Sequence, residues 1–155
     1  MNRIPARMRR APVRSLQEGV MLLEALIGIL IFSLGIMALV AMQSVSISNV
    51  SNARYRVEAA FLANEMLSTL WVDRGASSAN VDNYRYPGGS APQLAAWVNK
   101  VTTLMPQAGN YPPTVNVVAL PNVTSGRQVT VTVRWRAPDA LAPSNHIAIG
   151  YISDP

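Results

Sequence analysis

An uninterrupted apolar run near the N-terminus constrains this chain more than any other feature of its sequence. The run extends from Ala25 to Met42, and it holds no charged residue and Ser33 as its one polar side chain. A helix of this length rises about 27 Å, which is close to the apolar thickness of a bilayer. A conventional export signal has a shorter apolar core that ends at a small-residue cleavage site, and this run has neither property. The sequence therefore predicts a helix that can span a membrane.

The positive charge of the chain is concentrated in front of this run. Residues 1–19 carry five of the 13 basic residues and one of the eight acidic residues. The remainder is almost neutral, with eight basic against seven acidic side chains. Because positive flanks stay on the cytoplasmic side of a membrane, we expect residues 1–19 in the cytoplasm and the chain after the run outside it. This distribution indicates a leader segment and gives little support to a nucleic-acid partner.

The junction between the basic start and the apolar run has a specific order of residues, Gly19-Val20-Met21-Leu22-Leu23-Glu24. This order resembles the signal of prepilins, the precursors of type IV pilus subunits. The resemblance implies that a prepilin peptidase cuts between Gly19 and Val20 and that the new amine of Val20 is methylated. It also implies that Glu24, then the fifth residue, pairs with the N-terminal amine of a neighbouring subunit and sets the axial register of assembly.

Glu24 needs such a partner on physical grounds as well. An ionised carboxylate at the edge of an apolar helix costs several kcal/mol when it enters a membrane or a packed bundle unpaired. Alternatively, Glu24 lies at the level of the lipid headgroups, where the dipole at the helix N-terminus favours a negative charge. This alternative accounts for Glu24 in a subunit within the membrane, but it gives Glu24 no role in assembly.

The resemblance departs from the major pilins in two respects. Major pilins usually begin with Phe and often carry a proline that bends the helix. Here the first mature residue is Val20, and no proline occurs between Val13 and Tyr86. The departure favours a minor subunit with a straighter helix.

Helical spacing continues beyond the apolar run as far as Asp73, and Gly75 is a plausible C-terminal cap. A helix from Val20 to Asp73 would be about 80 Å long. We expect an i,i+4 pair between Arg54 and Glu58 on its polar side. The predicted amphipathic stripe consists of Val50, Ala53, Val57, Ala60, Phe61, Leu67 and Trp71.

The segment Ala59-Ala60-Phe61-Leu62-Ala63-Asn64-Glu65-Met66-Leu67 is similar to one that is common in the PilV family of minor pilins, the type IV pilus modification proteins. Related pseudopilins of type II secretion systems contain a similar sequence at this position of the helix. Glu58 and Glu65 lie seven residues apart on one helical face, where two solvated carboxylates are expected rather than an acid/base pair.

The remaining residues predict a small head domain. Residues 75–92 read as a loop with a turn at Pro87, and Pro92 opens a short helix. The expected buried side chains of that helix are Leu94, Trp97, Val98, Val101 and Leu104. Three strands are predicted, Val115–Leu120, Gln128–Arg136 and His146–Ile152.

The middle strand alternates between apolar and polar residues. We expect Val129, Val131, Val133 and Trp135 on one face, and Thr130, Thr132, Arg134 and Arg136 on the other. Residues 122–126 would be the turn before it. The predicted class is α+β and pilin-like, with a long N-terminal helix packed on a small antiparallel sheet. The predicted parts are a leader at 1–19, a transmembrane and assembly helix at 20–42, its amphipathic continuation at 43–74, and a periplasmic head at 75–155.

The resemblance implies a minor pilin, a subunit of the bacterial inner membrane that takes part in type IV pilus assembly and is not an enzyme. Its implied partners are the prepilin peptidase, other minor pilins and the major pilin, with no cofactor. A minor pseudopilin of type II secretion is the alternative. A DNA-uptake role would use Arg127, Arg134 and Arg136, but three strand arginines without an outward aromatic are weak support for it. The chain has no cysteine, so His146 alone indicates neither a metal ligand nor a base. The triplet at 122–124 fits a glycosylation sequon by pattern alone.

Overall fold

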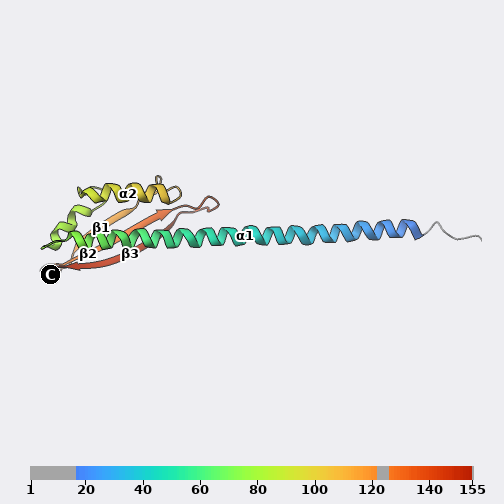
Figure 1. Ribbon diagram of the computed structural model, residues 1–155, viewed down its shortest axis with the longest axis horizontal. Helices are drawn as coiled ribbons and strands as arrows, with labels where there is room; N and C mark the ends of the chain where they lie inside the picture. The colour runs from blue at the N-terminus through green and yellow to red at the C-terminus, as the bar shows by residue number, and fades with distance from the viewer. Residues whose placement is uncertain (1–16, 122–125, 155) are drawn as a thin grey trace, which may run out of the picture. The chain divides into compact units, whose positions relative to one another are not determined.

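The computed structural model describes residues 17–121 and 126–154, with side chains from residue 19 onward. The elements are α1 (Gln17–Asp73), the 3-10 helix η1 (Ser78–Tyr84), α2 (Pro92–Leu104), β1 (Thr114–Ala119), β2 (Gly126–Trp135) and β3 (Ser144–Ser153) (Figure 1). The chain divides into two compact units, residues 1–46 and residues 47–155, and α1 contributes to both. The predicted combination of a long N-terminal helix with a small antiparallel sheet is confirmed.

The bounds of α1 follow from its composition. It is rich in Leu, Ile, Ala and Met, and it holds no proline that would interrupt its hydrogen bonds. It ends at Asp73, as predicted, because Gly75 takes a positive φ of 58°. A left-handed residue directly after a helix turns the chain away and satisfies its last carbonyls. The helix begins at Gln17, three residues before the predicted start at Val20.

The three strands form one antiparallel sheet in the order β1-β2-β3. Ten consecutive residue pairs join β2 to β3, from Gly126 opposite Ser153 to Trp135 opposite Ser144. The predicted alternation in β2 is confirmed, since its valines and Trp135 are buried and Arg134 is exposed. The three predicted strands are each observed, with ends shifted by one or two residues.

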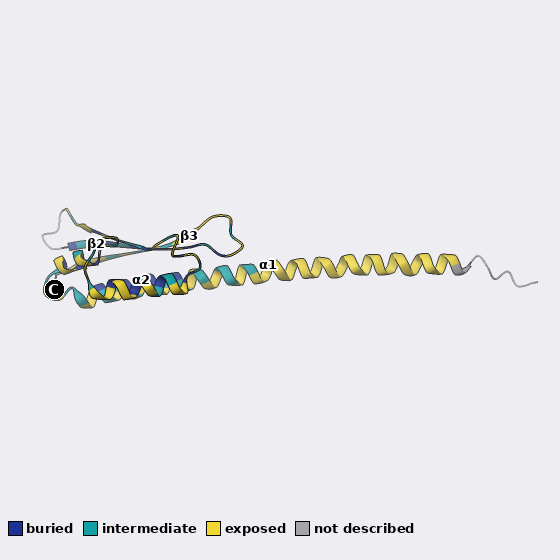
Figure 2. Cartoon of the chain, turned by 90° about the horizontal axis from the view of Figure 1, so that it is seen from above, coloured by how far each residue is buried: buried dark blue, intermediate teal, exposed yellow. Residues whose placement is uncertain are grey.

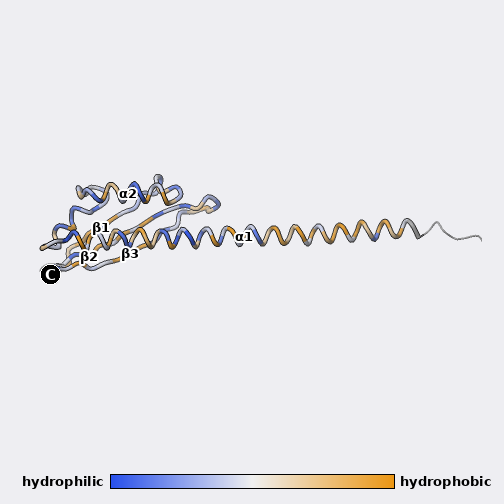
Figure 3. The backbone as a smooth tube through the Cα atoms, in the orientation of Figure 1, coloured by the Kyte–Doolittle hydropathy of each residue, from blue (hydrophilic) through white to orange (hydrophobic). Residues whose placement is uncertain are grey.

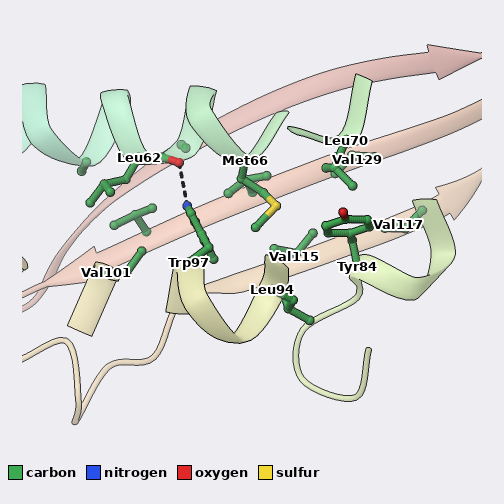
Figure 4. Close-up of a cluster of buried hydrophobic side chains, with 14 of the residues drawn as sticks. Leu62, Met66, Leu70, Tyr84, Leu94, Trp97, Val101, Val115, Val117 and Val129 are labelled. Carbon is green, nitrogen blue, oxygen red and sulfur yellow. Dashed lines mark hydrogen bonds between the residues drawn. The ribbon is translucent and has the colours of Figure 1, made fainter. Parts of the chain in front are cut away.

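In the unit of residues 47–155, the helices form one layer and the sheet forms the other. Figure 2 shows α1 and α2 together on one side of the strands. The hydrophobic core lies between the layers, where Leu62, Met66 and Leu70 of α1 meet Leu94 and the valines of β1 and β2 (Figure 4). Burial of each large side chain stabilises the fold by about 1.5–3 kcal/mol relative to exposure.

The face of α1 that packs in this core differs from the predicted stripe. The buried residues are Ala59, Leu62, Ala63, Met66 and Leu70. Of the predicted stripe, Leu67 and Ala60 are half-buried, while Val50, Val57, Phe61 and Trp71 are exposed. The prediction was wrong because α1 is apolar on two opposite sides, and spacing alone does not tell which side meets the sheet.

A glycine in β3 permits the close approach of α1 to the sheet. A Cβ atom on Gly150 would lie 2.9 Å from Cδ2 of Leu67, which is closer than ordinary van der Waals contact. The neighbouring inward residue, Ala148, is also small and packs against the core. The helix therefore lies close over β3 because the strand offers small side chains on that side.

Two further predictions for the head need correction. Residues 75–92 are not all loop, because η1 occupies Ser78–Tyr84, with Val81 and Tyr84 buried in the core. In α2, Leu94, Trp97 and Val101 are buried as predicted, but Leu104 is 47% exposed because it lies in the last turn, beyond the edge of the core. The predicted turn at Pro87 is present. The predicted turn at residues 122–126 and the sequon at 122–124 lie outside the described residues, apart from Gly126, which begins β2.

Replacing Trp97 with Phe should lower the free energy of unfolding by about 1–3 kcal/mol. The indole Nε1 of Trp97 donates a hydrogen bond of 2.9 Å to the backbone carbonyl of Leu62, and the ring is 6% exposed. The variant loses the bond between α1 and α2 and leaves a small cavity. Thermal unfolding of the full chain in detergent, followed by near-ultraviolet circular dichroism, would measure the change.

Trp71→Phe is the matched control for this experiment. The ring of Trp71 is 44% exposed, and no described residue forms a hydrogen bond with it, so its replacement should change the free energy by less than about 0.5 kcal/mol. Equal losses in both variants would contradict the role assigned to Trp97.

Candidate functional site

The residues of the predicted processing signal lie near the start of α1. Gly19, Val20 and Glu24 are all helical and exposed, and a Cβ on Gly19 would meet no atom within 4 Å. Among the residues that the structure describes, nothing bonds to the carboxylate of Glu24. The sequence prediction that Glu24 needs a partner from elsewhere stays a prediction, and residues 1–16 of the predicted leader lie outside the described residues.

The apolar run presents a continuous series of exposed large hydrophobic side chains among the described residues. Its large side chains, between Leu26 and Met42, are 46–72% exposed. The tube in Figure 3 is predominantly orange along this part of α1, the colour of hydrophobic residues. By length and composition, α1 could cross a membrane.

The polar group inside the run is satisfied without any outside partner. The hydroxyl of Ser33 donates a hydrogen bond of 2.7 Å to the backbone carbonyl of Ile29, one helical turn earlier. A serine with this bond can lie in an apolar environment, because none of its donors is left free. The run therefore suits a water-free environment on every side of the helix.

A second uncovered apolar surface lies on α1 beside the head. It comprises Val50, Val57, Phe61 and Val72, which are 59–79% exposed, and we call it the outer ridge. Positions separated by 7, 4 and 11 residues share one line along a helix. The buried side chains of α1 project from the opposite side, and the described residues of this unit leave the outer ridge exposed.

The charged groups beside the outer ridge are arranged differently from the prediction. No ion pair joins Arg54 to Glu58 among the described residues. Glu65, predicted to be a solvated carboxylate, accepts two bonds of 2.7 and 2.8 Å from the ammonium of Lys100 on α2. Lys100 also lies 5.6 Å from the ring centre of Phe61. Tertiary contact between the two helices brings Lys100 to Glu65, 35 residues away, and spacing along α1 could not predict it.

The three strand arginines do not form a basic strip. Arg127 lies on the helix-facing side of β2, where its guanidinium pairs with the carboxylate of Asp82 at 3.2 Å. Arg134 is exposed on the other side, and Arg136 follows the end of the strand. The alternation of a strand places residues 127 and 134 on opposite faces. The arrangement gives no shared surface for a nucleic-acid backbone.

Two aspartates of the fold accept hydrogen bonds from hydroxyl groups, Asp73 from Tyr84 and Asp139 from Ser48. Burial and the hydrogen bond that its hydroxyl donates to Asp73 raise the pKa of Tyr84 far above its usual range. Ser48 donates a bond of 2.5 Å to Asp139, and this bond lowers the pKa of that carboxyl. Both contacts hold the ends of the helix segment against the head, and neither provides a free acid or base.

The described residues contain no cluster of three or more His, Cys, Asp or Glu side chains that could hold a metal ion. His146 is half-buried on β3 opposite Val133. One hollow of about 400 Å³ is lined by Asn49, Asn52, Arg56, Trp135 and three other residues. Its lining has no carboxylate, histidine or hydroxyl–base pair from which to build a catalytic group.

Comparisons of this chain with family models, with curated proteins and with solved structures find no match.

Changing Phe61 to Ser should leave the fold intact, whereas the same change at the adjacent Leu62 should disrupt it. Phe61 is 59% exposed on the outer ridge, and Leu62 is fully buried in the core. We expect a change below about 0.5 kcal/mol for Phe61→Ser. We expect a loss of about 3–5 kcal/mol for Leu62→Ser, from the cavity and the buried hydroxyl.

Thermal unfolding of both full-length variants in detergent would measure these values. A loss at Phe61 as large as that at Leu62 would contradict the assignment of the outer ridge as surface.

Proposed function

We propose that this chain is a minor pilin of the PilV kind, a non-catalytic subunit of the bacterial inner membrane that takes part in type IV pilus assembly. The observation that supports it best is the uncovered apolar surface of α1 in both units. The prepilin-like signal around Gly19, Val20 and Glu24 supports a role for that surface in packing against other pilus subunits. The head would lie in the periplasm, since the basic residues of 1–19 favour the cytoplasm.

In this function the apolar run would occupy two environments in turn, the membrane and a bundle of subunit helices. Each exposed Leu or Ile side chain costs about 1.5–3 kcal/mol in water relative to burial. The membrane removes that cost for a single subunit. When the subunit leaves the membrane, the same side chains need the helices of other subunits around them. The bond from Ser33 to Ile29 leaves the run equally suited to lipid and to a helical bundle.

Glu24 supplies the specificity that apolar packing lacks. Hydrophobic contact between helices is tolerant of axial sliding, whereas a buried carboxylate must find a positive partner. The N-terminal amine of an adjacent processed subunit would be that partner. A subunit out of register would leave both charges unpaired, which is the costlier state.

The outer ridge extends the packing surface to the part of α1 beside the head. Phe61 and Val57 lie on the side of the helix away from the sheet, where a neighbouring helix could cover them without disturbing the core. The head would then determine which subunits fit together. The start at Val20 and the absence of a proline within α1 favour a minor rather than a major subunit.

Replacing Gly19 with a bulky residue such as Leu should block processing. The intact mass of the wild-type chain extracted from native membranes should equal that of an N-methylated chain starting at Val20. The Gly19→Leu variant should keep its full length. Gly28→Leu is the matched control, since Gly28 also has no atom within 4 Å of its Cβ position but lies outside the signal. An uncut wild-type chain, in cells that process other prepilins, would overturn the proposal.

The same cells distinguish a pilus from a secretion system. Loss of surface filaments when this chain is deleted, with normal export of secreted enzymes, would support a minor pilin. Normal filaments with failed export would assign the processed chain to a type II secretion system instead.

Replacing Glu24 with Gln should leave processing intact but lower the amount of this chain in sheared filaments at least tenfold. The amide cannot form the charge pair with the incoming amine, so the register is no longer specified. Glu58→Gln is the control, because Glu58 is half-buried beside the head and has no ion-pair partner among the described residues. Equal incorporation of Glu24→Gln and the wild type, by quantitative mass spectrometry, would contradict the role of Glu24.

A further inference from the structure

We propose that β3 is a docking edge that pairs with an extended segment of a different membrane-anchored subunit. The inference deepens the proposed function by naming the surface and the kind of partner it takes. It rests on three features of the sheet: an edge strand with no backbone cover among the described residues, an outward row of apolar side chains, and a second edge that is short and paired at its start.

The first feature is the length and openness of β3. It has ten residues, which is about twice the commonest strand length. It is the last strand of the sheet, so β2 occupies one side and no strand occupies the other. Within residues 17–121 and 126–154, a single hydrogen bond reaches β3 from outside the sheet, from the guanidinium of Arg74 to the carbonyl of its last residue, Ser153. The remaining backbone groups on that side are available for another strand.

The strand also lacks the features that usually protect an edge. Natural edge strands are blunted by lysine, proline, a bulge or a short length. The sequence of β3 contains no charged residue and no proline, and it pairs one-to-one with β2 without a bulge. An edge of this kind is suited to pairing with a further strand.

The second feature is an inverted pattern of exposure. The large side chains of Ile147, Ile149 and Tyr151 are 53%, 53% and 60% exposed, and we call them the β3 row. In the middle of the strand the inward positions hold Ala148 and Gly150, and the large inward residue Ile152 is fully buried near the strand end. The close approach of α1 over Gly150 accounts for the small inward residues. It does not account for isoleucine and tyrosine on the outer face, which no helix of this unit covers (Figure 2).

The third feature is the contrast with the opposite edge. Strand β1 has six residues. The backbone of Tyr86 exchanges two hydrogen bonds with Val115 at the start of β1, with lengths of 2.9 and 3.1 Å. The chain therefore pairs the start of the β1 edge with its own backbone, whereas no backbone segment among the described residues pairs with the free side of β3.

The area of the β3 row indicates that the partner is held by a second contact. A large side chain presents roughly 200 Å², so three at about half exposure offer on the order of 300 Å². A stable interface buries roughly 800 Å² on each partner. A freely diffusing protein would bind this edge weakly. A partner anchored in the same membrane is already at a high effective concentration, so the small contact suffices.

A second copy of this chain fits the edge poorly. In Figure 1, β3 points in the direction in which α1 runs beside it. Antiparallel pairing of two β3 strands would therefore reverse one α1 segment relative to the other, whereas helices inserted from one side of a membrane run the same way. Parallel pairing about a two-fold axis would place the two β3 rows on opposite faces. Stacking of the two outer faces would hold the α1 helices roughly 30 Å apart, beyond helix contact.

The complementary segment has a defined chemistry. It is extended, it donates and accepts main-chain hydrogen bonds along the free side of β3, and it places alternate apolar side chains beside the β3 row. Apolar residues suit those positions, because β3 itself carries no charged side chain.

Photocrosslinking in native cells tests this proposal with the full-length chain. A benzophenone amino acid replaces Ile149 on β3 or, as the matched control, Val118 on β1, which is 51% exposed on the same outer face at the opposite, shorter edge. We expect an adduct from position 149 whose crosslinked peptide belongs to the head of a different membrane-anchored subunit. We expect at least tenfold less adduct from position 118.

A second pair of variants tests whether formation of the adduct depends on the β3 edge. With the crosslinker at Tyr151, Ile149→Lys should lower the adduct at least tenfold, because lysine protects an edge, and Val118→Lys should change it less than twofold. Both side chains are about half exposed, so the thermal midpoints should stay within a few degrees of the wild type.

Equal adducts from both edges, or none at position 149, would overturn the docking edge. An adduct joining two copies of this chain would overturn the choice of partner. Intact mass of the same samples reports processing at Gly19, so failure of the docking edge with normal processing is distinguishable from failure of the proposed function.

Discussion

The structure depends on one helix that has more apolar surface than the rest of the chain can cover. In the unit of residues 47–155, the sheet and α2 bury the side of α1 that carries Leu62, Met66 and Leu70, and leave the outer ridge exposed. In the unit of residues 1–46, the described residues leave the apolar run without cover. Exposed hydrocarbon at this density requires a lipid or protein environment. The proposed function supplies both, first a membrane and then the helices of other subunits.

The head is joined to α1 by contacts that use few large residues on the helix. Ala59 and Ala63 let the sheet and α2 approach closely, and Gly150 does the same from the side of β3. Polar bonds then fix the position of the helix along the head. The indole of Trp97 bonds to the backbone of Leu62, and Lys100 pairs with Glu65. Because these bonds come from one side of α1, the other side stays free for contacts outside the chain.

The two edge strands of the sheet, β1 and β3, differ in length and in how far other segments of the head cover them. The backbone of Tyr86 covers part of the short strand β1, while β3 is long, uncharged and open. The close approach of α1 accounts for Gly150 on the inward face of β3, while Ile147 and Ile149 lie on the outward face. A docking role for that edge, if taken together with the outer ridge, would give the chain two separate contacts with its neighbours, one along the helix and one along the sheet. A subunit that must join several partners in a defined order benefits from such separate contacts, since each can be weak by itself.

Local patterns in the sequence predicted the two α-helices and the three strands of this fold, but not η1. Helical spacing and Gly75 predicted the end of α1, Pro92 predicted the start of α2, and the alternation of Val129, Val131 and Val133 predicted which face of β2 is buried. These features depend on residues near one another in the chain. The signal around Gly19 and Glu24 is also local, and it carries the functional prediction. Tertiary structure alone decided which of the two apolar sides of α1 meets the sheet, that Glu65 pairs with Lys100, and that Ile147 and Ile149 face outward. Each of these depends on how closely distant segments pack, and an apolar residue has the same local signature whether its cover comes from its own chain or from another.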